Sequence, residues 1–594
     1  MTNSEIAKIL RETALLCEMK GIEFKPRAYE KAASEIEASQ RSVAEIYAKF
    51  GIEGIYKNPE TKIASVGRGI AEHIVELLEK GYFAEYKKLK KEILVDLESL
   101  SGIEGVGPRG ILKLYKKLGV KNIAELEKAA KAGKIRSIAG FGEKSEKKIL
   151  EGIEFKKKFS GRFVLGFIMP QILEIENRLK KLKEVEKIAV AGSVRRMKET
   201  VGDCDILIVS DNPKPVMDFF VKMPEAAKII AHGETKSAVK LSNGLDVDLR
   251  VVPAESFGAA IQYFTGSKDH NIVLRKIAIE KGWKLNEYGL FQSAEKTRNK
   301  RGITRKLKIL AGETEEVIYE KLGLKWIPPE LRENSGEIEA ARKGKLPDLI
   351  GYGDLKGDLQ IQTNWTDGVN SIEEMAKEAI KRGLEYIAIT DHTKALAMTG
   401  GLDEKKLIKQ MKEIDKINFK FKKIGVNFRV LKGAEVNILK DGSLDIKDEV
   451  LAKLEIVGAA VHSHFNLSRK EQTARIIRAM KNKNVDVIFH PTGRIIGRRE
   501  PYEIDIGEIV KAAKETGTIL EIDAYPDRLD LKDEYVRRAV KSGVKLAIDS
   551  DAHAAAHIQY LEYGVAQARR GWAEKKDIIN AWPLEKMIKF LKSK

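Results

Sequence analysis

The sequence has few cysteines and no long apolar run, and both absences narrow the class of protein. Only Cys17 and Cys204 occur among 594 residues, so a framework of disulfide bonds is excluded and a reducing compartment is expected. No apolar run is long enough to span a bilayer, and no signal peptide is recognisable at the start of the chain. We therefore expect a cytoplasmic protein that does not enter a membrane.

Acidic residues are in the minority. The 107 Lys and Arg residues against 88 Asp and Glu residues give a formal net charge of +19, which favours a polyanionic partner such as a nucleic acid. The alternative is a lysine-rich surface without such a partner, because part of the excess lies in runs such as 87–91 and 156–158 that suit solvated helix faces. The length predicts roughly three or four domains.

Two aspartates open an apolar run in the middle of the chain. Asp203 and Asp205 precede residues 206–209, so on a strand both carboxylates face the same way. A second predicted strand carries Asp246 and Asp248, and spacing alone does not decide which of these two joins them. Such a cluster repels itself unless cations fill it, and hard oxygen ligands suit Mg²⁺ or Mn²⁺. Two such ions can activate a hydroxyl and stabilise a leaving pyrophosphate, which is the chemistry of a nucleotidyltransferase.

A phosphate-binding element precedes these aspartates. Gly192 and Ser193 offer a close backbone approach and a hydroxyl, while Arg195 and Arg196 offer forked donors. An Asp-x-Asp pair alone is most often a solvated turn. The nearby Gly-Ser-x-Arg-Arg sequence and the second strand favour the catalytic interpretation.

Residues 1 to about 155 read as short helices broken by glycine turns. Three turns have the form Gly or Ser, apolar residue, Gly, and each precedes a predicted helix. This helix-hairpin-helix pattern aims backbone N–H groups at a phosphate, so it predicts DNA binding without sequence preference. The glycines concerned are Gly67, Gly69, Gly105, Gly107, Gly140 and Gly142.

The carboxy-terminal part, from about residue 351, alternates short apolar strands with amphipathic helices, which predicts a βα-repeat barrel. Polar residues at the strand ends should then gather on one face. Five of the nine histidines fall there together with carboxylates, and this pattern predicts a multinuclear Zn²⁺ or Mn²⁺ site. The strand-end residues are Asp391, His392, Glu435, His462, His464, His490, Asp551 and His553. Of the histidines, His464 is interpreted as a non-ligand despite this position, as are His232, His270 and His557.

Together these residues resemble a family X DNA polymerase of the bacterial and archaeal type, fused to a polymerase-and-histidinol-phosphatase (PHP) domain. The resemblance extends over the whole chain and includes residues 247–250, 263–267 and 286–288. It implies a multidomain α+β and α/β protein with helix-hairpin-helix domains (1–85 and 86–158), a palm (159–255), a thumb-like subdomain (256–325), a linker (326–350) and a distorted PHP barrel (351–594).

The resemblance also implies roles for single residues. It selects Asp248 as the third catalytic ligand, and it implies triphosphate binding by Ser193 and Arg196. Tyr263 and Phe264 would lie against the sugar. The remaining residues implied at the nucleotide or template are Gly192, Gly266, Ser267, Asn271 and Arg275. The ligands implied for the PHP cations are Asp367, His392, Glu435, His462, His490, Asp551 and His553.

The sequence departs from the family pattern in two respects, one near the amino-terminus and one at the start of the PHP domain. His73 stands where animal relatives carry the lysine that removes a 5′-deoxyribose phosphate, so lyase activity by a Schiff base is not expected. Gln360 and Gln362 stand where PHP domains carry two metal-binding histidines. By resemblance the first cation would keep only Glu435 and Asp551 as strong ligands. We therefore expect an incomplete Zn²⁺ or Mn²⁺ cluster with little or no 3′→5′ degradation of DNA.

The leading hypothesis is a monomeric, template-directed polymerase that fills short gaps during base excision repair, using Mg²⁺ or Mn²⁺, dNTPs and gapped or primer-template DNA. One alternative is an active PHP domain, either a 3′-5′ exonuclease or an endonuclease at abasic sites. A second makes the PHP domain a structural platform that positions DNA. A template-independent nucleotidyltransferase is the weakest alternative, because three duplex-binding hairpins would have little purpose there.

Overall fold

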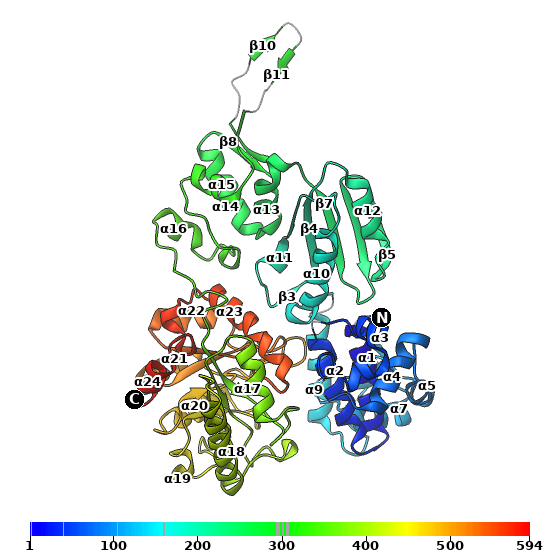
Figure 1. The fold of residues 1–594 in the computed structure, drawn as a ribbon, viewed down its shortest axis with the longest axis vertical. Coiled ribbons are helices and arrows are strands. Elements are labelled where there is room, and N and C mark those ends of the chain that lie inside the picture. Colours follow the sequence, from blue (N-terminus) through cyan, green and yellow to red (C-terminus); the bar gives the residue numbers. More distant parts are fainter. Residues whose placement is uncertain are drawn as a thin grey trace.

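The computed structural model describes residues 1–594 except 2, 40, 64, 104, 159, 160, 293–296, 300, 301, 305–307 and 594. The chain forms a helical amino-terminal block, a mixed α/β block and a carboxy-terminal barrel (Figure 1). The multidomain fold class predicted from the sequence is confirmed.

The amino-terminal block is made of helices with one apolar face each. A single cluster of buried apolar residues runs from Ile6 to Ile153, across the predicted domain boundary at residues 85 and 86, which stays a prediction. The helices are α1 (Asn3–Met19), α2 (Lys25–Ala38), α3 (Val43–Tyr56), α4 (Arg68–Lys80), α5 (Ala84–Glu92), α6 (Leu97–Leu100), α7 (Pro108–Leu118), α8 (Ile123–Lys131) and α9 (Glu143–Lys158).

The α/β block is centred on a five-stranded sheet in the order β2-β4-β7-β6-β5. Its strands are β2 (Lys187–Val190), β4 (Asp203–Val209), β5 (Ala226–His232), β6 (Lys236–Leu241) and β7 (Asp246–Val251). Strands β4 and β7 run parallel, and the other neighbours are antiparallel. Ile206 and Ile208 share a core with α10 (Leu165–Lys180) and α12 (Pro213–Val221), whereas Leu207 packs toward α13 (Phe257–Thr265). Alternate β4 side chains therefore serve opposite faces.

The thumb-like region begins with α13. It contains α14 (Lys268–Glu280), the sheet β12-β9-β8, and α15 (Glu315–Leu322). Its strands are β8 (Trp283–Asn286), β9 (Gly289–Gln292) and β12 (Lys308–Ala311), and β10 (Thr297–Asn299) pairs with β11 (Gly302–Thr304). The segment predicted as a linker is packed, because Ile327, Leu331 and Ile338 are buried in the same core as α14 and α15.

The carboxy-terminal barrel has seven parallel strands in chain order, β13 to β19. They are β13 (Gly357–Ile361), β14 (Tyr386–Ile389), β15 (Arg429–Asn437), β16 (Ile456–Ala460), β17 (Val487–Ile488), β18 (Ile519–Asp523) and β19 (Leu546–Asp549). A parallel bridge between Ile361 and Ala552 brings the first strand against the segment after the last, so the barrel is nearly closed. This confirms the predicted barrel.

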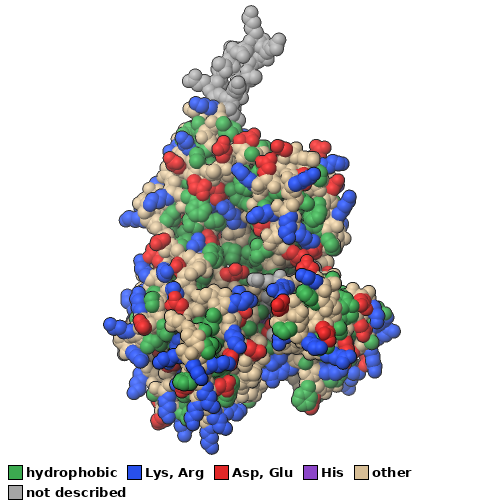
Figure 2. All heavy atoms as spheres, in the orientation of Figure 1, with side chains coloured by type: hydrophobic (Ala, Val, Ile, Leu, Met, Phe, Trp, Pro, Cys, Tyr) green, Lys and Arg blue, Asp and Glu red, His purple; other side chains and the backbone are tan. Residues whose placement is uncertain are grey.

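Ion pairs and hydrogen bonds join the blocks. Arg494 of the barrel contacts Glu199 at 2.8 Å, and Arg570 of α23 (Leu561–Arg570) contacts Glu333 at 3.2 Å. Figure 2 shows Lys and Arg side chains concentrated low on the barrel, in the region of α18 (Glu404–Lys423), and mixed with acidic ones elsewhere. Within the described residues, no helix has the length and apolar character needed to cross a membrane.

Two candidate metal centres

Strands β4 and β7 place four aspartates at one end of a sheet. The register pairs Asp203 with Asp246 and Asp205 with Asp248. Because side chains alternate along a strand, these carboxylates lie on the face opposite to the buried Cys204. All three carboxylates implied by the resemblance therefore share one face, and Asp205 stands directly beside Asp248.

The two candidates for the third carboxylate have different surroundings. Asp248 Oδ2 lies 2.7 Å from Lys236 Nζ and 3.3 Å from Arg250 Nη2, whereas Asp246 Oδ1 lies 2.5 Å from Lys240 Nζ. Burial, followed by the carboxylates of Asp203 and Asp248, raises the pKa of Asp205 to about 6. A buried carboxylate facing two others is a place that a divalent cation would stabilise.

Gly192 brings the phosphate-binding element close to these aspartates. It begins the short helix α11 (Gly192–Arg195) with a φ of +66°, and an added Cβ would lie 3.0 Å from Asp205 Oδ2. A side chain at this position would therefore be strained and would crowd the carboxylate. Ser193, the next residue, is half-buried beside it.

The two arginines of this element have different partners. Arg195 forms two hydrogen bonds to Glu315, at 2.9 and 2.8 Å, and is turned into the thumb-like region. Burial would raise the pKa of Glu315, but Arg332 and Arg195 lower it to about 2. Arg196 donates to Glu333 at 3.0 Å and to the carbonyl oxygen of Thr265. Arg195 therefore supports the site, while Arg196 is held by groups that a phosphate could replace.

The residues implied at the nucleotide gather at the junction of α13 and α14. The Tyr263 and Phe264 rings lie edge to face, 5.2 Å apart, and Phe264 packs 4.8 Å from the Arg250 guanidinium. Asn271 donates to the Tyr263 carbonyl oxygen at 2.7 Å, and Arg275 donates to the Asn271 carbonyl oxygen at 3.2 Å. An added Cβ on Gly266 would lie 3.1 Å from Arg196 Nη1, and Ser267 caps α14.

Three glycine turns precede helices, as the sequence predicts. Gly67, Gly107 and Gly142 stand immediately before α4, α7 and α9, and an added Cβ on any of them meets nothing within 4 Å. Two residues before each of these glycines, Ser65, Gly105 and Gly140 have φ of +60°, +90° and +95°. Gly69 lies within the first turn of α4. The helix amino-termini are thus open to an approaching phosphate.

His73 lies among aromatic side chains on α4. Its ring stacks on Phe83 with centroids 4.4 Å apart, and its Nδ1 is hydrogen-bonded to the Tyr29 hydroxyl at 3.0 Å. Burial lowers the pKa of His73. These contacts give the residue a packing role.

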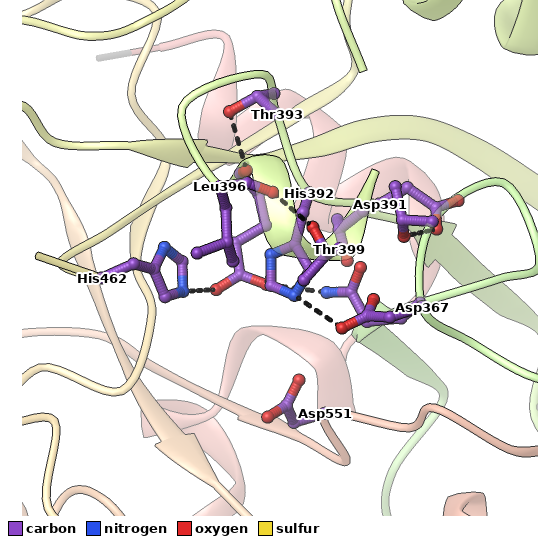
Figure 3. Close-up of polar contacts among 12 residues, drawn as sticks. Asp367, Asp391, His392, Thr393, Leu396, Thr399, His462 and Asp551 are labelled. Carbon is purple, nitrogen blue, oxygen red and sulfur yellow. Dashed lines mark hydrogen bonds and ion pairs between the residues drawn. The ribbon is translucent and has the colours of Figure 1, made fainter. Parts of the chain in front are cut away.

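The second centre lies inside the barrel, around Glu435 of β15. Its Oε1 is 2.9 Å from Nε2 of both His462 and His490, and its Oε2 is 3.2 Å from His392 Nδ1. The histidines follow the ends of β14, β16 and β17. Figure 3 shows His392 and His462 directed toward a common centre, with Asp367 beside His392 and Asp551 on another side.

The donors of this centre fit divalent cations. Two groups have ligand atoms that all lie within 4.8 Å of one another, Asp367 with His392 and His553, and His392 with Glu435 and His462. Asn437 Oδ1 lies 2.8 Å from His462 Nδ1, and the Asp551 carbonyl oxygen lies 2.8 Å from His553 Nδ1. Such outer partners orient imidazoles toward a metal. The mixture of imidazoles and carboxylates suits Zn²⁺ or Mn²⁺.

The position of the first cation, whose strong ligands would be Glu435 and Asp551, fits a metal less well. Gln362 Nε2 donates to Glu435 Oε2 at 2.7 Å, and Asp551 Oδ2 lies 3.4 Å from Arg528 Nε. Both amide atoms of Gln360 are buried without a hydrogen-bond partner in the described structure. The two strong ligands of this position are therefore faced by donors of the protein itself.

Three contributors to these centres escaped the sequence interpretation. Asn437 lies two residues after Glu435 on the same strand, so the period of two could have identified it. Lys236 and Arg528 reach the aspartates from other segments, and no local pattern marks them. Their roles depend on the folded sheet.

Comparison with known proteins agrees with this arrangement. Residues 1–83 match the helix-hairpin-helix domain family, 97–154 the SAM-like helix-hairpin-helix tandem, 260–333 the DNA polymerase beta thumb, and 358–524 the PHP domain. The chain is 40% identical over 595 residues to the "DNA polymerase/3'-5' exonuclease PolX" of Bacillus subtilis, covering 100% of both. It is 25% identical over 299 residues to DNA polymerase lambda of Arabidopsis thaliana, covering 46% of this chain and 53% of that protein.

The barrel also has relatives of its own. A probable phosphatase of Thermoanaerobacter sp. (strain X514) is 33% identical over 235 residues, which cover 38% of this chain and 89% of that protein. The prediction of little or no 3′→5′ degradation loses support, because the barrel histidines and carboxylates are gathered and the full-length relative is named an exonuclease. The alternative of an active PHP domain is better supported.

Proposed function

The chain belongs to the PolX family of DNA polymerases, and from this premise we propose that it fills short gaps in DNA and removes nucleotides from 3′ ends. The observation that carries the first activity is the parallel register of Asp205 and Asp248 beside Gly192. The observation that carries the second is the buried Glu435 between His462 and His490.

In the polymerase reaction, Asp203, Asp205 and Asp248 would hold Mg²⁺ or Mn²⁺, which activates the primer 3′-hydroxyl and neutralises the leaving pyrophosphate when bound. The hydroxyl attacks the α-phosphorus of a dNTP, a phosphodiester bond forms and pyrophosphate leaves. Arg196 would exchange Glu333 for the triphosphate, because a guanidinium forks onto phosphate oxygens. Before substrate binds, Lys236 and Arg250 compensate the charge of Asp248.

The nucleotide would be positioned by the junction of α13 and α14. Tyr263 and Phe264 would pack on the deoxyribose, and crowding there disfavours a 2′-hydroxyl. The open turns at Gly67, Gly107 and Gly142 would hold the DNA backbone through their N–H groups. We propose base excision repair as the setting, because turns of this kind would hold a duplex by its backbone without reading its sequence.

In the nuclease reaction, water attacks the terminal phosphodiester, which leaves a 3′-hydroxyl and releases a nucleoside monophosphate. Asp367, His392 and His553, together with Glu435, His462 and His490, would hold Zn²⁺ or Mn²⁺, which lowers the pKa of the attacking water when bound. Asn437 and the Asp551 carbonyl would keep the imidazoles oriented.

A labelled gapped duplex tests both activities. With Mg²⁺ or Mn²⁺ and dNTPs, we expect extension that ends where the gap ends. Without dNTPs we expect stepwise shortening of the labelled strand. Extension of an untemplated primer would contradict the polymerase proposal, and absence of shortening with either Mn²⁺ or Zn²⁺ would favour the platform hypothesis for the barrel.

A further inference from the structure

Two protein groups face the oxygen atoms that the first cation of the barrel would need. Gln362 Nε2 lies 2.7 Å from Glu435 Oε2, and Arg528 Nε lies 3.4 Å from Asp551 Oδ2. An N–H group cannot be a ligand, and it repels a cation placed on the same oxygen. Protein N–H groups therefore face both of these carboxylate oxygens, while within the described residues the amide oxygens of Gln360 and Gln362 have no hydrogen-bond partner.

The strand that lines this position supplies no imidazole. Gln360 and Gln362 lie two residues apart at the end of β13, so both side chains point into the barrel. Both are completely buried, and neither amide atom of Gln360 has a hydrogen-bond partner in the described residues. Two amides are weak ligands for Zn²⁺ compared with two imidazoles.

Arg528 brings a permanent positive charge to this side of the centre. Its Nε lies 3.4 Å from both Asp523 Oδ2 and Asp551 Oδ2. The Arg528 side chain as a whole is 23% exposed.

We infer that the Arg528 guanidinium replaces the first cation, so that the barrel binds two cations and holds the scissile phosphate against Arg528. A guanidinium supplies charge and a planar pair of donors that match phosphate oxygens. The count of cations is independent of the proposed exonuclease activity, whereas the phosphate contact rests on that activity.

Cation stoichiometry tests the first half of this inference. The full chain carrying Asp205→Asn and Asp248→Asn, which silences the polymerase centre, is stripped with a chelator, reloaded with Mn²⁺ and analysed for bound metal. We expect two ions per chain. With Gln360→His and Gln362→His added we still expect two, because Arg528 keeps its place; adding Arg528→Ala as well should give three. The inference would be overturned by three ions in either protein that retains Arg528. It would also be overturned by two ions in the protein that carries all three barrel changes, Gln360→His, Gln362→His and Arg528→Ala.

Exonuclease turnover tests the second half. With the polymerase carboxylates intact, Arg528→Gln should lower the exonuclease kcat by about 10²-fold, the usual cost of losing one donor to a developing charge. Arg528→Lys should lose less, and gap filling should be unchanged in both, which reports folding. Wild-type exonuclease kcat in Arg528→Gln would overturn the phosphate contact. If gap filling is lost in Arg528→Gln, the Arg528→Lys protein decides, because a wild-type kcat and KM there would show that the guanidinium fork has no role.

Discussion

The two metal centres stand at opposite ends of their strands. In the polymerase sheet, Asp203 is the first residue of β4 and Asp248 the third of β7, so the site forms at the amino-terminal ends of a parallel pair. In the barrel, His392, His462 and His490 follow the carboxyl ends of β14, β16 and β17. Both sets of strand ends bring together residues that are distant in sequence. The barrel has seven strands and surrounds its centre, whereas the polymerase centre lies on one face of an open sheet.

The charge around each centre differs accordingly. The polymerase carboxylates are compensated by Lys236, whose side chain is 42% exposed and free to move aside. Glu435 is compensated by imidazoles and an amide within the barrel. The comparison teaches that the charges of the polymerase carboxylates are compensated by an exposed side chain, whereas those of the barrel centre are compensated by buried groups that are already in place.

The substitution Asp248→Ala should give the largest effect, and it tests whether the polymerase and barrel centres act independently. Removing this carboxylate should lower nucleotide addition by at least about 10³-fold, because it removes stabilisation of charge in the transition state. Exonuclease activity should remain. The matched control is Asp246→Ala, two residues away on the same face but paired with Lys240. Single-turnover extension of a gapped duplex measures both; equal losses would contradict the choice of Asp248.

His490→Ala breaks the enclosed centre in the same way. We expect exonuclease activity to fall by about 10²–10³-fold, because Glu435 loses one of its two partners at Oε1. Gap filling should be unaffected. His464→Ala is the control, since this exposed histidine lies outside both cation groups. Shortening of labelled primer in the absence of dNTPs measures the effect, and undiminished shortening by His490→Ala would place the nuclease elsewhere.

Glu315→Gln tests a residue that supports the polymerase centre from the thumb-like region. It leaves Arg195 and the buried Arg332 without a carboxylate and should cost about 3–5 kcal/mol in the stability of the thumb-like region. Glu316→Gln, on the exposed side of α15, is the control.

The pH dependence of that stability has a definite sign. Because the pKa of Glu315 falls from 4.5 to about 2 on folding, its contribution is complete above pH 4.5 and is lost as pH falls toward 2. Acid unfolding followed by near-ultraviolet circular dichroism should show a shallower slope in this interval for Glu315→Gln. An identical slope would refute the assignment.

The smallest effect is expected at the glycine turns that precede α4, α7 and α9. Gly107→Ala adds a methyl group into open space, so folding should be kept while a phosphate is held off. We expect gapped-duplex binding to weaken by about 1–2 kcal/mol, or roughly tenfold. Gly353→Ala, at another open glycine, is the control. Titration at several salt concentrations measures it, and unchanged affinity would remove this turn from the DNA surface.

The sequence predicted the strands that carry the candidate ligands of both centres better than it predicted the side chains that contact those ligands. Asp203 and Asp205 alternate with buried residues, and the barrel histidines follow apolar runs, so local period and strand ends were sufficient. Glu333 lies in a segment predicted as a linker from its prolines, yet it packs against the thumb-like core and holds Arg196. Arg528 and Lys236 depend on neighbours supplied by other strands, which no local pattern reveals.

The central claim is that one chain carries two independent centres with opposite effects on a DNA 3′ end. The most direct measurement counts both products from one gapped duplex supplied with dNTPs: pyrophosphate from extension and nucleoside monophosphate from hydrolysis. Wild type should release both, Asp248→Ala only the monophosphate, and His490→Ala only pyrophosphate. Loss of both products in either variant, or of neither, would contradict the account.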